Sequence, residues 1–232
     1  EIFMNIAKFP YEKIISTNAE IKKETSEEKD YWTIPNVEYN GKIISRDLKK
    51  ELLPSNNQEG HLEDALKAGE TGFKIMDKDL EYAITKAAYF MKKSKEKKEI
   101  RSFLKESFYN YYLVSGTSVF YNPEGEKDIV KHKVRDESIK VNAIGPNEKV
   151  IDSKTKEFYK ALLGENDLQI ANDVYKWVTR EDLYSWRLDS KQSQTIEGVV
   201  KSNSNSDRFD LFACGIPASR YRCFGGRESQ TK

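Results

Sequence analysis

Apolar residues recur every three or four positions between Asp77 and Met91, and this spacing constrains the fold more than any other feature of the sequence. It places one set of side chains on a single helical face: Leu80, Ala83, Ile84, Ala87, Phe90 and Met91. We therefore predict an amphipathic helix here, with Asp77 or Asp79 suited to cap its N-terminus.

Other segments show helical spacing on the C-terminal side of this one. The apolar face resumes over 100–104 after a lysine-rich run, which we interpret as a solvated turn or outer surface. Helices are also predicted over 152–162, with Gly164 just past the end, and over 168–178. A further short helical turn is expected at 179–186.

Strand-like segments occupy both ends of the chain. Near the C-terminus we predict strands over 195–200, 209–214 and 221–224, separated by Ser/Asn-rich and Gly-Ile-Pro loops. Residues 1–60 mix short apolar pieces with turn signals and are interpreted as strands and loops.

The chain contains no Gly/Ser-rich or Pro-rich linker that would separate two domains. We therefore expect residues 1–60 to form an N-terminal strand and loop region packed on a main domain of residues 61–232. The aromatic and β-branched stretch 108–114 contains three tyrosines, and we expect these to be core side chains and not a platform for stacking bases.

Charge and hydropathy exclude several classes of partner. Lys and Arg total 39 against 38 for Asp and Glu, so the net charge of +1 provides no field that would attract nucleic acid. No run approaches the roughly 18 consecutive apolar residues of a membrane span. We expect no nucleic-acid partner and no membrane span.

Recognisable catalytic and metal-binding motifs are also missing from the sequence. It has only two Cys and two His, far apart, which argues against a structural metal site. It contains no Gly-rich phosphate loop, no His-Glu-x-x-His and no Gly-x-Ser-x-Gly. We therefore predict a protein that is not an enzyme and needs no cofactor.

The residue composition changes abruptly near the C-terminus. Residues 202–227 contain no Lys, Glu, Gln, Trp or Met, although these five types account for 65 of the 232 residues. A window of this length would be expected to hold about seven of them. The same window holds four of the nine Arg and both Cys.

Two pressures would produce this change. A recognition surface favours Arg, Tyr and short polar residues, because they bind at a lower entropic cost than Lys and Glu. Alternatively, codons that descend from AAC or AAT by random replacement of the adenines cannot encode any of the five missing types.

The order of short motifs in this tail resembles a known family. Ile196-Glu197-Gly198-Val199-Val200-Lys201-Ser202-Asn203 is followed by Phe209-Asp210-Leu211-Phe212-Ala213, Pro217-Ala218-Ser219 and Phe224-Gly225-Gly226-Arg227. Their order resembles the tail of C-type-lectin-fold variable proteins of diversity-generating retroelements, in the branch of the fold that includes formylglycine-generating enzymes, and the match covers about forty residues. The chain departs from the family pattern at Glu197, Val199, Lys201 and Gly226.

The resemblance implies an α+β fold, namely a C-type-lectin-like domain with an irregular antiparallel sheet, several flanking helices and a variable region at about 202–223. It implies a non-catalytic protein that binds a protein or cell-surface ligand. It also implies that this protein lies on a virion or on a cell surface. The implied scaffold positions are Gly198, Phe212, Ala213, Gly225 and Arg227. The implied ligand-binding positions are Ser202, Asn203, Asn205, Asp207, Arg208, Asp210, Cys214, Arg220, Tyr221 and Arg222.

The two cysteines admit three interpretations. Cys214 and Cys223 lie on predicted neighbouring strands, so a cross-strand disulfide is possible if their Cα atoms lie within about 7 Å. In the second interpretation, the two cysteines are isolated products of diversification. In the third, which follows from the resemblance to formylglycine-generating enzymes, they are the catalytic pair of a copper oxidase. A further alternative for the whole chain is a structural attachment subunit, favoured by the tyrosine-rich segment.

Overall fold

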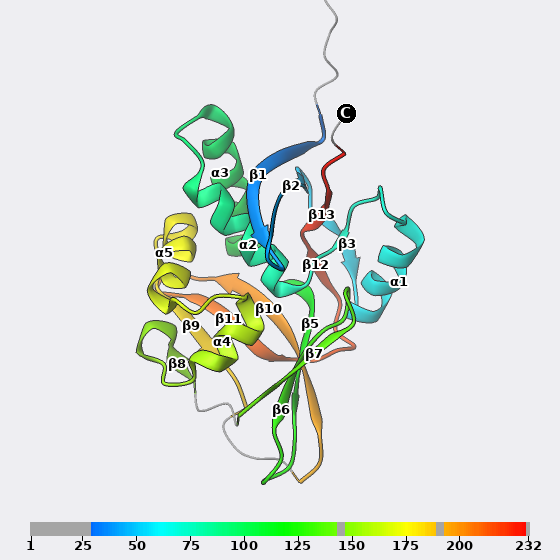
Figure 1. Ribbon diagram of the computed structural model, residues 1–232, viewed down its shortest axis with the longest axis vertical. Coiled ribbons are helices and arrows are strands. Elements are labelled where there is room, and N and C mark those ends of the chain that lie inside the picture. The colour runs from blue at the N-terminus through cyan, green and yellow to red at the C-terminus, as the bar shows by residue number, and fades with distance from the viewer. Residues whose placement is uncertain (1–28, 143–146, 189–192, 231–232) are drawn as a thin grey trace, which may run out of the picture.

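The computed structural model describes residues 29–142, 147–188 and 193–230, which form two sheets and a group of helices (Figure 1). The smaller sheet has the strand order β1-β2-β13-β4. Its strands are β1 (Tyr31–Tyr39), β2 (Lys42–Lys49), β13 (Gly225–Glu228) and β4 (Lys74–Ile75). Strands from the two ends of the described chain therefore lie in one sheet, because β13 pairs with β2.

The larger sheet has the order β3-β12-β5-β10-β11-β9-β8. Its strands are β3 (Leu53–Asn56), β12 (Tyr221–Cys223), β5 (Leu113–Tyr121), β10 (Ile196–Ser204), β11 (Phe209–Gly215), β9 (Leu183–Trp186) and β8 (Glu148–Lys149). β6 (Asp128–His132) also pairs with β5, and β7 (Glu137–Val141) pairs with β6.

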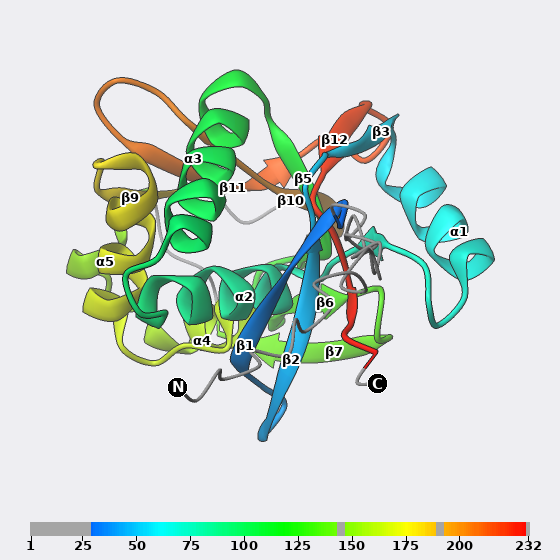
Figure 2. The same ribbon diagram turned by 90° about the horizontal axis from the view of Figure 1, so that it is seen from above.

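Most of the helices gather on one side of the molecule, and α1 lies apart from them on the other (Figures 1 and 2). The helices are α1 (Gln58–Ala68), α2 (Lys78–Phe90), α3 (Lys95–Asn110), α4 (Lys156–Leu163) and α5 (Leu168–Thr179), with a 3₁₀ turn at Val150–Asp152. α3 contacts β10, and α5 contacts β9 and β11, so one face of the larger sheet is covered by helices. This arrangement confirms the predicted α+β class.

Aromatic side chains fill the space between this sheet and the helices. The Phe108 ring lies 4.8 Å from that of Phe209 and 5.3 Å from that of Phe224, both edge-on. Tyr175 stacks on Phe209 at 4.3 Å. Trp32 of β1 belongs to the same hydrophobic cluster, so the described part of residues 1–60 shares its core with the rest of the chain. Its predicted limit at residue 60 falls inside α1.

The predicted helices are confirmed where the apolar spacing is long. α2 and α5 occupy the expected segments. α4 begins at Lys156 and not at the predicted residue 152, which belongs to the 3₁₀ turn, and its C-cap is Gly164, whose φ of 70° is the left-handed conformation that glycine adopts readily. Asp77 occupies the N-cap position of α2, but its side chain makes no capping hydrogen bond.

Two local predictions are wrong, that the tyrosines of 108–114 lie in the core and that 179–186 forms a helical turn. The stretch 108–114 is divided, because α3 continues to Asn110 and β5 begins at Leu113. Within it, Tyr111 and Tyr112 are 40% and 47% exposed and do not belong to the core. The segment 183–186 is strand β9 and no helical turn, because it pairs in parallel with β11.

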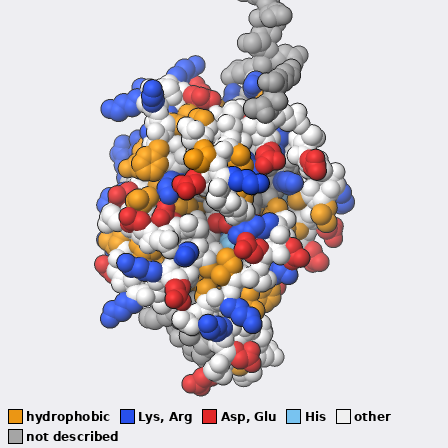
Figure 3. Space-filling view, viewed as in Figure 1, with side chains coloured by type: hydrophobic (Ala, Val, Ile, Leu, Met, Phe, Trp, Pro, Cys, Tyr) orange, Lys and Arg blue, Asp and Glu red, His pale blue; other side chains and the backbone are white. Residues whose placement is uncertain are grey.

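On the face seen in Figure 3, basic and acidic side chains are interspersed, and neither sign covers the surface. Among the residues that the structure describes, no helix is both long enough and apolar enough to cross a membrane.

Candidate functional site

Side chains of β10, β11 and β9 alternate between the helix-covered face of the larger sheet and its opposite, outer face. Phe209, Leu211 and Ala213 of β11 point into the core and are fully buried. Phe212 and Cys214 alternate with them and are partly exposed, as are Lys201 and Asn203 of β10. The C-terminal strands therefore present a second surface that the core does not use.

On this outer face, aromatic rings and cations form one continuous cluster, which we call the outer-face patch. β12, β5, β10, β11 and β9 are consecutive neighbours in the sheet, so side chains from distant segments meet here. The members of the patch are Tyr112, Tyr184, Trp186, Lys201, Asn203, Arg208, Phe212 and Tyr221. Each is partly or substantially exposed.

Lys201 lies at the centre of the patch. Its Nζ is 4.7 Å from the ring centroid of Tyr112, 4.9 Å from that of Tyr221 and 5.2 Å from that of Phe212. Phe212 in turn stacks on Trp186, with centroids 6.1 Å apart and an interplanar angle of 16°. Strand pairing dictates these neighbours, since Phe212 is opposite Lys201 on one side and Trp186 on the other.

Asp210 holds the other end of the patch together. Its Oδ1 accepts from Trp186 Nε1 at 2.7 Å and lies 2.9 Å from Arg208 Nε, and its Oδ2 accepts from Asn205 Nδ2 at 3.1 Å. The Arg208 guanidinium rests 5.0 Å from the Trp186 ring centroid. Burial raises the pKa of Asp210, which the contacts with Trp186 and Arg208 partly oppose.

The ten positions implied by the family resemblance divide into three groups. Asp207, Arg220 and Arg222 are exposed, and Asn203, Asn205, Arg208, Cys214 and Tyr221 are partly exposed. The remaining two, Ser202 and Asp210, are buried, at 0% and 3% exposure. They cannot touch a ligand directly, because Ser202 points into the core and Asp210 is covered by the side chains that it binds.

Arg220 and Arg222 lie to one side of the patch. Arg220 donates to the backbone oxygen of Ser55 of β3. The Arg222 guanidinium lies 4.9 Å from the Tyr111 ring centroid, and both line a groove with Glu51 and Glu106. The groove also includes Phe103 and Ser107 of α3, so Arg222 lies on the side of the sheet that α3 covers, and neither arginine belongs to the outer-face patch.

Most implied scaffold positions make internal contacts. A Cβ on Gly198 would lie 2.2 Å from the backbone oxygen of Ala213, so only glycine fits there. Ala213 and Gly225 are buried, and Arg227 pairs with Asp47 at 3.1 Å. The assignment of Phe212 as scaffold is wrong, because its ring lies on the outer face.

The cysteines are not on neighbouring strands. β11 carries Cys214 and β12 carries Cys223, and β10 and β5 lie between them in the sheet. They form no disulfide. Cys223 is buried beside His61, with 3.6 Å from Sγ to Nδ1, and burial raises the pKa of its thiol well above the usual range. A buried neutral thiol is a poor nucleophile and a poor metal ligand.

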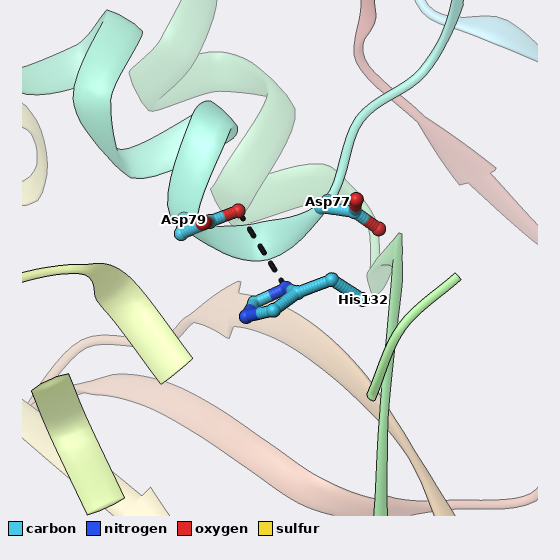
Figure 4. Close-up of side chains that lie close together, drawn as sticks. All are labelled: Asp77, Asp79 and His132. Atoms are coloured by element: carbon cyan, nitrogen blue, oxygen red, sulfur yellow. Dashed lines mark ion pairs between the residues drawn. The ribbon is translucent and has the colours of Figure 1, made fainter. Parts of the chain in front are cut away.

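A second polar cluster lies where the N-terminus of α2 meets β6 (Figure 4). The ligand atoms of Asp77, Asp79 and His132 all lie within 4.8 Å of one another, and all three residues are buried. Asp77 accepts from the backbone N–H groups of Val134 and Arg135, both at 3.1 Å. Asp79 pairs with the Arg135 guanidinium.

The groups of this cluster already have protein partners. His132 Nε2 donates to the backbone oxygen of Ala161 at 2.8 Å, and Nδ1 lies 2.9 Å from Thr117 Oγ1. Arg135 supplies the positive charge opposite Asp79, so a metal ion would have to displace it. These contacts make the cluster an anchor for the turn between β6 and β7, and we assign it no metal.

Sequence reasoning missed Tyr112, Tyr184, Trp186 and Lys201 as members of the site. Three of them precede the window of altered composition, and Lys201 immediately adjoins it. Alternation along 183–186 was the one available signal, since Leu183 and Ser185 are buried while Tyr184 and Trp186 are partly exposed. Tyr112 joins the patch only through the pairing of β5 with β10 and β12, which the sequence does not reveal.

Comparison of the sequence with protein-family models found no match, and neither curated proteins nor solved structures gave a significant match.

Proposed function

We propose that this chain is a non-catalytic binding protein whose outer-face patch recognises a macromolecular ligand. The observation that carries the proposal is that successive side chains of β10 and β11 lie on opposite faces of the sheet. Alternate side chains fill the core, while the intervening ones lie on one outer face as an aromatic and cationic cluster. Such a face can change its side chains without loss of packing.

The chemistry of the patch also supports binding. Aromatic and arginine side chains dominate the energetic centres of protein interfaces, because they bury large areas at a low entropic cost. Tyr112, Tyr184, Trp186, Phe212 and Tyr221 are already held by neighbours in the sheet. A partner would therefore meet a surface whose side chains have little freedom left to lose.

We further propose that the fold is C-type-lectin-like and that its tail descends from a diversifying retroelement. The pairing of β13 with β2, which brings strands from both ends of the described chain into one sheet, supports the fold. The composition of residues 202–227 supports the diversification. Sequencing the neighbouring genome tests the latter: a template repeat should differ from this gene only at adenines, and differences at other bases would reject it.

The binding function is tested by site-specific photocrosslinking in an extract of the source cells or of their natural target. A benzophenone side chain replaces Asn203 on the patch or, as a matched control, Ile43, which is 71% exposed on the hairpin of β1 and β2. We expect a discrete crosslinked product from position 203 that unmodified protein competes away, and none from position 43. Identical products from both positions, or no specific product from 203, would reject the proposal.

Two alternatives make different predictions. A copper oxidase of the implied kind uses both Cys214 and Cys223, so replacement of either by Ser should abolish oxidation of a thiol substrate by a copper-loaded sample. The separation of the two strands weighs against a paired-cysteine mechanism. A structural attachment subunit should self-assemble, and light scattering that finds a monomer at every concentration would weigh against it.

A further inference from the structure

The centre of the outer-face patch carries a positive charge without an acidic partner. Among the residues that the structure describes, no carboxylate lies within ion-pair distance of Lys201 Nζ. Its polar contact within the protein is with Tyr221 Oη, at 3.3 Å. The other neighbours are the rings of Tyr112, Phe212 and Tyr221, which attract a cation through their π-electrons but do not neutralise it.

Arg208, the other cation of the patch, differs in this respect. Its Nε lies 2.9 Å from Asp210 Oδ1, and Asp210 is buried, so this pair is balanced within the protein. Asp207, in the loop between β10 and β11, is exposed and immediately precedes Arg208 in the chain. The uncompensated charge of the patch is therefore localised at one atom, Lys201 Nζ.

The rings of the patch are already engaged with one another and with the cations. Phe212 stacks on Trp186, and Arg208 lies over Trp186 and Tyr184. Lys201 lies over the rings of Tyr112, Phe212 and Tyr221. Single-stranded nucleic acids need free ring faces for stacking and a track of cations for successive phosphates. The patch offers neither, because one cation alone is unpaired.

We infer that the patch selects an acidic segment of a protein partner, which brings an Asp or Glu carboxylate to Lys201 Nζ. This inference rests on the proposed binding function and specifies the chemistry of its ligand. The three rings hold the lysine side chain in place, so the entropy normally lost when a lysine forms an ion pair is already reduced. Apolar side chains beside the carboxylate would cover Tyr112 and Phe212 and exclude water from the pair.

The variants for the test change the charge at this position and at a control position. Lys201→Gln removes the charge, and Lys201→Arg keeps it. Lys140→Gln removes a charge from an exposed position on β7, which lies outside the patch. Phe212→Ser removes the central ring. Thermal unfolding of each variant establishes that it is folded before binding is measured.

The probe is a random dodecapeptide display library, selected on the wild type and on each variant. We expect peptides enriched in Asp and Glu, with binding weakened about tenfold or more by Lys201→Gln, largely retained by Lys201→Arg and unchanged by Lys140→Gln. The affinity should fall as salt is added. A parallel selection uses a random single-stranded DNA pool as the competing class of ligand.

Several results would overturn the inference. The selection could enrich no peptides, or peptides without an excess of Asp and Glu. Lys201→Gln could bind the selected peptides as tightly as the wild type does, or DNA could bind more tightly than any peptide. Peptides that depend on Phe212 but not on Lys201 would overturn it and leave the proposed binding function intact. Peptides that depend on neither residue would overturn both.

Discussion

Lys78 Nζ donates a hydrogen bond to Ser202 Oγ at 2.6 Å, and this contact joins the first turn of α2 to the inner face of β10, directly behind the outer-face patch. Both residues have 0% exposure. Lys78 Nζ also pairs with Glu81 Oε1 at 2.5 Å, so the charge of this buried lysine is balanced inside the core. The strand that carries Lys201 and Asn203 is thus fixed from behind by a buried polar contact.

Lys78→Met should lower the free energy of unfolding by about 3 to 5 kcal/mol, because it leaves the Glu81 carboxylate buried and unpaired. The double variant Lys78→Met with Glu81→Leu should recover much of this loss, since neither charge then remains. Urea unfolding of both variants and the wild type measures the difference. If the free energy of unfolding of Lys78→Met alone lay within about 1 kcal/mol of the wild-type value, the role assigned to Lys78 would be contradicted.

Adjacent positions on β10 should respond oppositely to the same substitution. Ser202→Tyr should cost about 3 kcal/mol or more or prevent folding, because its side chain points into the filled core. Asn203→Tyr should change stability by less than about 0.5 kcal/mol, because that side chain lies on the outer face. Thermal unfolding of the matched pair is the measurement, and equal tolerance at both positions would refute the orientation of β10.

Gly198→Ala should destabilise the protein by about 1 to 3 kcal/mol, because the added methyl group would overlap the Ala213 backbone oxygen. The control Asn203→Ala lies on the same strand and should be nearly neutral. Chemical denaturation measures both. An unchanged midpoint for Gly198→Ala would mean that β10 and β11 are farther apart than the structure has them.

The stability of the protein should carry a pH-dependent contribution from Asp77. Burial raises the pKa of this carboxyl to about 6, although hydrogen bonds from Val134 and Arg135 and the charge of His132 lower it and Asp79 raises it. A raised pKa in the folded state favours the protonated form, so this contribution is present below pH 4 and is lost as the pH rises through 6.

The measurement for Asp77 is the free energy of unfolding of the wild type and of Asp77→Asn between pH 4 and 7. The wild type should lose stability relative to the variant as the pH rises across this range. A constant difference between the two proteins would show that Asp77 has an ordinary pKa in the folded state.

Cys223 should not react with iodoacetamide at pH 8 in the folded protein, because its thiol is buried and its pKa is raised. It should become reactive when urea unfolds the chain, and peptide mass spectrometry identifies the modified residue. Partly exposed Cys214 provides the internal comparison. Rapid modification of folded Cys223 would indicate a lowered pKa and would revive the catalytic interpretation.

Local spacing in the sequence was sufficient for the helices and for the main C-terminal strands. Apolar side chains repeated over three or more turns determine α2 and α5 whatever surrounds them, because one face must be buried. The short segment 183–186 could not be assigned in this way. Its four residues suit a helical turn or a strand equally, and the pairing of β9 with β11 decides between them.

The sequence by itself determined the main helical segments and C-terminal strands and located a segment of unusual composition at its C-terminus. Only the tertiary structure decided which of those side chains are available to a partner. The physical reason is that strand register turns Ser202 inward and Asn203 outward, and strand order brings Tyr112 and Trp186 to Lys201. These pairings depend on contacts between residues far apart in the chain, which no local pattern encodes.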